Sequence, residues 1–209
     1  MCEIFVLFDG YSRQINNKIM EANCTCTLIK AQKNIIVDTM TAWDRSRLED
    51  ALLRHGILPS NIHYVVCTHS HADHIGNNNL FTNAEHIVGY SVQQKTSFYD
   101  KQIEQEDYIL CKGVRVTATP GHTHEDVTVL VENDSVKYAL TGDLFEKEED
   151  ITNPALWQNL GTLQLRKVQA LTRLRILKYA DWIIPGHGAM FKKTSVQVAF
   201  LEKQILETT

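Results

Sequence analysis

The sequence has little that would mark an exported or membrane-spanning protein. No apolar run among its 209 residues approaches the roughly 20 that are needed to cross a bilayer. The opening residues, MCEIFVLFDG, carry two acids and lack a basic leader, a long apolar core and a small-residue cleavage site. We therefore expect no export signal and no membrane partner.

Cysteine is scarce, and its number is odd. Five thiols cannot all pair within one chain, so the disulfide framework of a small secreted domain is not expected. Cys24 and Cys26 are two residues apart on an expected strand, so their side chains should share one face. No second pair completes a metal site with them, which favours packing in the core. Reduced thiols indicate the cytosol or the nucleus.

Positive charge is in deficit, with 21 basic residues against 25 acidic ones and a formal net charge of −4. The chain as a whole is therefore not a polycation with general affinity for nucleic acid. With 44% hydrophobic and 22% charged residues, the composition suits a compact fold with a substantial core. We expect one domain over residues 1–209, because the sequence has no internal repeats, low-complexity tracts or linker-like stretches.

Apolar strands are predicted in two batches, and helices follow each batch. The first batch contains EIFVLFDG and the hairpin CTCTLIKAQKNIIVDT, with a helix expected over 43–55 and a further strand over 62–68. Residues 91–110 are polar and ambiguous. The second batch runs from GVRVTATPG to SVKYALTGD, with a long helix expected over 155–179 and a closing helix over 194–206. Two sheets packed face to face, with helices outside, would bury these strands in an α+β fold.

Residues 68–74 read THSHADH, which places three histidines and an aspartate directly after an apolar strand. Neutral imidazole nitrogens and carboxylate oxygens are good ligands for zinc or iron. The alternative is a polar surface turn, but a dense ligand set at a strand end is hard to explain by solvation alone. The segment therefore predicts a metal site that includes His69, His71, Asp73 and His74.

Three further candidates occupy the same local context, each just past an apolar strand and each preceded by glycine. They are His122 in TATPGHT, Asp143 in YALTGD and His187 in WIIPGHG. Glycine lets the backbone turn sharply and approach an ion closely, whereas an ordinary core histidine needs no such arrangement. The full set of seven ligands is too large for one tetrahedral ion and suits two ions that share a bridging carboxylate.

The order of these motifs, H-x-H-x-D-H, then TPGH, GD and a late PGHG, resembles the metallo-β-lactamase superfamily. The resemblance extends back to Asp38 in VDT and so spans nearly the whole chain. It implies a four-layer αβ/βα sandwich. It also implies that His69, His71 and His122 hold one ion, that Asp73, His74 and His187 hold a second, and that Asp143 bridges the two. Asp38 then orients the ligand loops.

The expected chemistry is hydrolysis. Two dications close together lower the pKa of a shared water to about 7, so that hydroxide can attack a carbonyl or a phosphorus at neutral pH. Asp73, a neighbour of that nucleophile, is the candidate for managing its proton, and Asp143 is the bridging ligand. Zinc is the metal we expect, although these ligands also accept iron or manganese.

The substrate is open at this point. Segments such as NCTCTLI, THSHADHIGNNNLF and GDLFE resemble a small animal member of the superfamily. That resemblance implies a dinuclear endoribonuclease that cleaves single-stranded RNA at the 3′ end of histone-coding pre-mRNA. The alternative is a small-molecule hydrolase for thioesters, esters or lactones, of the glyoxalase-II type. A mono-iron oxygen-dependent enzyme is a lesser option, because it leaves Asp73, His74 and His187 without a role.

The distribution of basic and acidic residues only partly supports an RNA substrate. Seven basic residues lie between 156 and 193, and Arg166 and Arg173 are seven apart, so a helical stripe could follow a phosphate backbone. The same residues could equally be the ordinary solvated face of a helix, and the acids at 146–150 would repel a polyanion near the site. His124 is expected to reach the substrate or a supporting carboxylate. The resemblance alone implies that Tyr11 and Ser12 also line the substrate site. A homodimer would be ordinary and could unite two basic helices.

Overall fold

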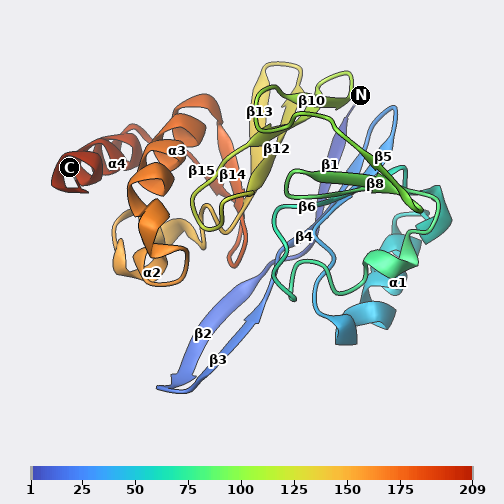
Figure 1. The fold of residues 1–209 in the computed structure, drawn as a ribbon, viewed down its shortest axis with the longest axis horizontal. Coiled ribbons are helices and arrows are strands. Elements are labelled where there is room, and N and C mark those ends of the chain that lie inside the picture. The colour runs from blue at the N-terminus through green and yellow to red at the C-terminus, as the bar shows by residue number, and fades with distance from the viewer. Residues whose placement is uncertain (1, 209) are drawn as a thin grey trace.

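The computed structural model describes residues 2–208, which form two β-sheets with helices on their outer faces and a projecting hairpin (Figure 1). The first sheet has the strand order β1-β4-β5-β6-β7-β8-β9. Its strands are β1 (Glu3–Phe8), β4 (Cys26–Lys30), β5 (Asn34–Val37), β6 (Tyr64–Cys67), β7 (Glu85–Val88), β8 (Ser91–Gln94) and β9 (Ser97–Tyr99). The pairs β5–β6 and β6–β7 are parallel, and the other neighbours are antiparallel.

The second sheet has the order β10-β11-β12-β13-β14-β15 and one parallel pair, β13–β14. Its strands are β10 (Tyr108–Cys111), β11 (Val114–Ala118), β12 (Val127–Asn133), β13 (Val136–Gly142), β14 (Trp182–Pro185) and β15 (Phe191–Lys192). A separate hairpin of β2 (Tyr11–Asn16) and β3 (Ile19–Asn23) extends away from both sheets in Figure 1.

Alternating side chains divide the core into layers. In β4, Leu28 packs outward toward helix α1 (Arg45–Arg54), whereas Ile29 packs inward between the sheets. The inner core joins residues of the first sheet, such as Val66, to residues of the second, such as Val129. This alternation is what the two-residue period of a strand requires when both faces of a sheet are covered.

The outer face of the second sheet is covered by helices α3 (Arg166–Tyr179) and α4 (Ser195–Thr208). Ile176 and Leu201 pack there against residues of the sheet such as Ile183. Helix, sheet, sheet and helix therefore stack as four layers, which confirms the predicted α+β sandwich.

Three local predictions need correction or completion. The helix expected over 155–179 is interrupted: α2 (Ala155–Gln158) ends early, and α3 begins only at Arg166. Gly161 lies in the break, where an added Cβ would come within 2.9 Å of the His122 Cα, so the chain passes closely over a predicted ligand loop. The ambiguous segment 91–110 supplies β8, β9 and β10, and the β2–β3 hairpin was not anticipated.

Cysteine and helix length agree with the sequence-based expectations. All five cysteines are free, and Cys24 and Cys26 are buried in the core under α1. Within residues 2–208, no helix combines the length and the apolar character that a membrane span requires.

The strands direct the candidate ligands to one edge of the sandwich. The strands β5, β6, β11, β13 and β14 lead at their carboxyl ends into Asp38, the 68–74 segment, His122, Asp143 and His187, respectively. Side chains from both sheets can therefore meet there, at the carboxyl edge where open α/β sheets commonly bind ligands.

Candidate metal centre

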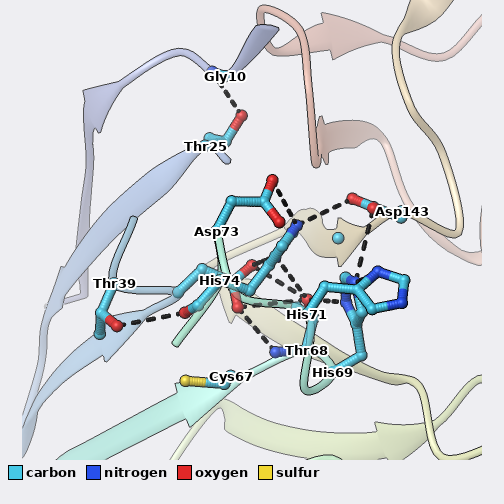
Figure 2. A network of polar contacts seen from close by, with 12 residues as sticks. Gly10, Thr25, Thr39, Cys67, Thr68, His69, His71, Asp73, His74 and Asp143 are labelled. Atoms are coloured by element: carbon cyan, nitrogen blue, oxygen red, sulfur yellow. Dashed lines mark hydrogen bonds and ion pairs between the residues drawn. The ribbon is translucent and has the colours of Figure 1, made fainter. Parts of the chain in front are cut away.

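Asp38 organises the segment that follows β6. Its carboxylate accepts hydrogen bonds from the Thr68 backbone N–H (2.8 Å) and the Thr68 hydroxyl, and it lies 3.0 Å from His74 Nδ1. Figure 2 shows Thr68 and His74 of this network, at the start of the ligand loop. Because Nδ1 of His74 faces a carboxylate, its proton belongs on that nitrogen, which leaves Nε2 free to bind a metal.

One group of four side chains converges at the first predicted ion position. His71 Nδ1 lies 2.9 Å from His69 Nε2 and 3.1 Å from His122 Nε2. Asp143 Oδ2 lies 3.6 Å from His69 Nε2 and 3.4 Å from His122 Nε2. All four ligand atoms fall within 4.8 Å of one another, so the structure brings together the set predicted for this position.

A second group shares Asp143 with the first. His74 Nε2 and His187 Nε2 each lie 3.3 Å from Asp143 Oδ1, and they lie 3.8 and 3.7 Å from Asp73 Oδ2, respectively. The Asp143 carboxylate therefore lies between the two groups, as a bridging carboxylate must, although its Oδ2 also lies 3.3 Å from His187 Nε2. The stick view in Figure 2 places Asp73, His74 and Asp143 around one space.

The backbone of the projecting hairpin fixes the orientation of His187. Nδ1 of His187 lies 3.1 Å from both the Tyr11 and the Asn23 carbonyl oxygens, so this nitrogen carries the proton and donates it. Nε2 is then the lone-pair nitrogen, and it points toward Asp143. The resemblance predicted that Tyr11 lines the substrate site, and the structure adds a contact of its backbone carbonyl with the metal centre.

The charges of the centre are strongly coupled. Burial, followed by the neighbouring His74, holds the pKa of His69 well below its usual value, and burial likewise lowers the pKa of His122. Burial opposes charge on His187 too, but Asp143 outweighs it and raises the pKa of His187 to about 9. Burial also raises the pKa of Asp143, but the adjacent histidines, led by His187, outweigh it and hold that pKa well below its usual range. A carboxylate surrounded by imidazoles results.

The donor set fits divalent metal ions, which the fold implies and which are typically zinc. Two buried ligand atoms, His74 Nε2 and Asp143 Oδ1, make no hydrogen bond with any residue between 2 and 208. Buried polar atoms are normally satisfied, and a cation would satisfy both of these at once. Imidazole nitrogens with a carboxylate are ligands that zinc accepts in four-coordinate sites.

Two glycines permit the ligand loops to pack closely at this point. Gly142 has a φ of +50°, and an added Cβ would lie 2.2 Å from the Thr68 hydroxyl oxygen. At Gly186, an added Cβ would lie 2.1 Å from Asp143 Oδ1. Glycine before Asp143 and His187 was predicted to let the backbone approach other groups closely. The packing of Gly142 against Thr68 and of Gly186 against Asp143 shows such an approach.

The loop after Asp143 contains an ion pair that the sequence did not reveal. Arg173 is completely buried between the rings of Phe145 and Trp157, donates to the Leu144 carbonyl (2.7 Å) and pairs with Asp150. The prediction that Arg173 contacts a phosphate backbone is wrong, because its guanidinium is enclosed by the protein.

The other predicted substrate residues lie in different surroundings. Arg166 is half-buried and donates to the Gln158 carbonyl (2.6 Å), which ties it to the break before α3. His124 is exposed, and the hydroxyl-bearing Ser12 is half-buried with its carbonyl accepting from Lys147 (3.3 Å). Their contacts with a substrate stay predictions.

The sequence model of the metallo-beta-lactamase superfamily matches residues 20–187, and the chain belongs to this superfamily. The fold and the motif resemblance are confirmed together. A metal-dependent hydrolase is therefore the class of protein that the family, the sandwich and the donor set define.

Two curated relatives and one solved structure illustrate the range of similarity. Metallo-beta-lactamase domain-containing protein 1 of Xenopus laevis is 38% identical over 193 residues, which cover 90% of this chain and 81% of that protein. The N-acyl homoserine lactonase of Bacillus cereus is 31% identical over 166 residues, covering 73% and 65%. The crystal structure of the metallo-beta-lactamase FIM-1 from Pseudomonas aeruginosa, in its mono-zinc form, has a TM-score of 0.65 at 15% identity and covers 95% and 89%.

Relatives differ in length. The chain spans 62% of the rat protein and 60% of the human protein that carry the same name as the frog relative.

Proposed function

We propose that this chain is a metal-dependent phosphodiesterase that cleaves single-stranded RNA. The observation that carries the proposal is a complete donor set with an exposed rim. His71 and His124 are exposed, and the Asp73 side chain is 22% exposed, whereas the Asp143 side chain is only 5% exposed. A centre that opens at the surface can be reached by a chain lying across it.

Each residue of the centre has a separable task. Bound divalent ions would supply a nucleophile at neutral pH and stabilise negative charge that develops on the substrate. Asp38 orients His74, and the Tyr11 and Asn23 carbonyls orient His187, so both imidazoles present Nε2 to the centre. The Asp73 side chain is partly exposed to solvent, so its carboxylate can accept a proton from an attacking water and release it outward.

Sequence similarity supports the RNA substrate more than surface charge does. The resemblance to metallo-β-lactamase domain-containing protein 1, now supported by 38% identity over 90% of this chain, implies cleavage at the 3′ end of histone-coding pre-mRNA. The predicted basic stripe of Arg166 and Arg173 does not support RNA binding, because Arg173 is buried. Glu148 and Glu149 remain exposed beside the centre. The proposal therefore rests on the donor set with its exposed rim and on the relationship, and not on a basic groove.

A lactone or ester is the second candidate substrate. The specific observation in its favour is the 31% identity to the Bacillus cereus lactonase over most of the chain. The same ligands serve both reactions, since a carbonyl and a phosphoryl group both develop negative oxygen charge on attack. The two candidates therefore differ in what lies around the metals and not in the metals themselves.

One experiment separates the two. Zinc-loaded protein is incubated with an end-labelled single-stranded RNA and, in parallel, with an N-acyl homoserine lactone. Asp143→Asn should abolish turnover, whereas Asp134→Asn, the same change in the exposed β12–β13 turn, should leave it intact. RNA cleavage lost only in Asp143→Asn and after chelation supports the proposal. Intact RNA with rapid lactone hydrolysis would replace it with the second candidate.

A homodimer and a nuclear or cytosolic location belong to the same proposal. Sedimentation of the purified protein at several concentrations tests the dimer, and imaging of the tagged full-length chain tests the location.

A further inference from the structure

Glu146 is a buried carboxylate that the seven-ligand scheme leaves without a task. It is 2% exposed, and its Oε2 makes no hydrogen bond with any residue in the described part of the chain. An acid buried in this way costs free energy unless a donor or a cation compensates it. An unexplained carboxylate three residues past the bridging ligand therefore needs a physical reason.

The backbone holds Glu146 firmly beside the metal centre. Its N–H donates to Asp150 Oδ2 (2.8 Å), and its carbonyl accepts from the His187 N–H (2.8 Å). Asp150 is in turn paired with Arg173 beneath the loop. Glu146 is thus attached at one side to a buried ion pair and at the other to the loop that carries a metal ligand.

The position of its side chain is that of a ligand. One ligand atom each of Asp143, Glu146 and His187 lie within 4.8 Å of one another, and all three residues are buried. Two ligands of one four-coordinate zinc ion lie about 3.3–3.6 Å apart, since each bond is about 2.0–2.2 Å long and the bonds meet at tetrahedral angles. Side-chain movements of about 1 Å would therefore let all three bind one ion.

We propose that Glu146 is an eighth metal-binding residue, which joins Asp143 and His187 around the ion on that side of the centre. The two ion positions then differ in chemistry. The first has three histidines and the shared Asp143, whereas the second gains a carboxylate beside Asp73. The inference concerns metal binding and holds whether the substrate is RNA or a lactone.

The test uses Glu146→Gln, which keeps the shape of the side chain and removes its charge. Glu149→Gln is the matched control, because Glu149 is exposed three residues further along the same loop. Metal content per chain and zinc affinity, by competition with a chromogenic chelator, are measured for the full chain. We expect Glu146→Gln to weaken the lower-affinity zinc at least tenfold, the change typical of losing a ligand or its close support. Glu149→Gln should match the wild type.

A stability measurement distinguishes a ligand from a structural residue. In chelator-treated protein, Glu146→Gln should be at least as stable as the wild type, because an uncompensated buried carboxylate has been removed. With zinc added, the variant should gain less in melting temperature than the wild type does. A variant that is destabilised without metal, and that binds both zinc ions as tightly as the wild type, would overturn the proposal. Cobalt in place of zinc gives a third readout, since the visible absorption of the ion bound near His187 should change only in Glu146→Gln.

Discussion

Replacing Arg173 with methionine tests whether the positive charge of α3 is structural or functional. The guanidinium is completely buried, donates to the Leu144 carbonyl and pairs with Asp150, whose Oδ2 also accepts from the Glu146 N–H. Removing one partner of a buried pair leaves an uncompensated charge and typically costs about 3–5 kcal/mol. For a chain of this size, that corresponds to a fall in melting temperature of about 6–20 °C.

The assay is urea unfolding of chelator-treated protein, in which metal binding makes no contribution. Arg166→Met is the matched control, because Arg166 begins the same helix but is only half-buried and bonds mainly to the Gln158 carbonyl. We expect the control to lose about 1.5 kcal/mol, the lower end of the range for hydrogen bonds of charged groups, because Arg166 is only half-buried. The double variant Arg173→Met with Asp150→Asn should recover part of the loss, since it removes the stranded carboxylate.

The opposite result would support the sequence-based hypothesis that Arg173 contacts RNA. If Arg173 contacts a phosphate backbone, Arg173→Met should leave the free energy of unfolding unchanged and weaken RNA binding uniformly across sequences, with a smaller dependence on salt. A loss no greater than that of Arg166→Met would therefore refute the burial argument.

Three further outcomes follow from the centre itself. Gly142→Ala should cost at least about 2 kcal/mol in thermal unfolding, whereas Gly56→Ala, also at positive φ but with no atom within 4 Å of the new Cβ, should cost about 1; equal losses would contradict the predicted collision. Because the pKa of His187 rises to about 9 in the folded protein, the contribution of His187 to the stability of the metal-free chain should be fully present below about pH 6.5. The chain should lose up to about 3 kcal/mol as the pH rises to 9, a loss that His187→Gln should flatten. Asp38→Asn should weaken zinc about 10–100-fold in chelator competition, because the amide donates to His74 Nδ1 and moves the ring proton to the metal-binding nitrogen; unchanged affinity would show that the tautomer is set elsewhere.

The ligands were predictable because their signals are local. Each one follows an apolar strand within a few residues, and parallel strands bring their carboxyl ends to one edge, so spacing along the chain becomes proximity in space. Asp38 needed the family resemblance in addition, because nothing around VDT shows that its carboxylate faces His74. The sequence therefore predicted the residues whose place in the fold is determined by the strand that they follow.

Arg173 and Glu146 could not be placed in this way. Charges on a predicted helix are normally solvated, and only the packing of Phe145 and Trp157 around Arg173 encloses its guanidinium. The acids of residues 146–150 formed one apparent cluster at the mouth of the site, yet the fold divides them. Glu146 and Asp150 are buried, whereas Glu148 and Glu149 are exposed. Only the exposed acids can repel a polyanion directly, and the sequence alone does not show which acids are exposed.

The metal centre joins two sheets that are otherwise held by their inner core. The 68–74 segment comes from the first sheet, and His122, Asp143 and His187 come from the second. Gly142 lies against Thr68 across this boundary, so the two ligand loops touch before any ion is bound. Ion binding then adds free energy to a contact that already exists, because the ligands of each ion come from both sheets. The inner core joins the sheets through apolar residues such as Val66 and Val129, whose contacts involve no ligand side chain. Metal removal should therefore loosen the ligand loops while the sandwich persists, and substrate binding should depend on metal far more steeply than folding does.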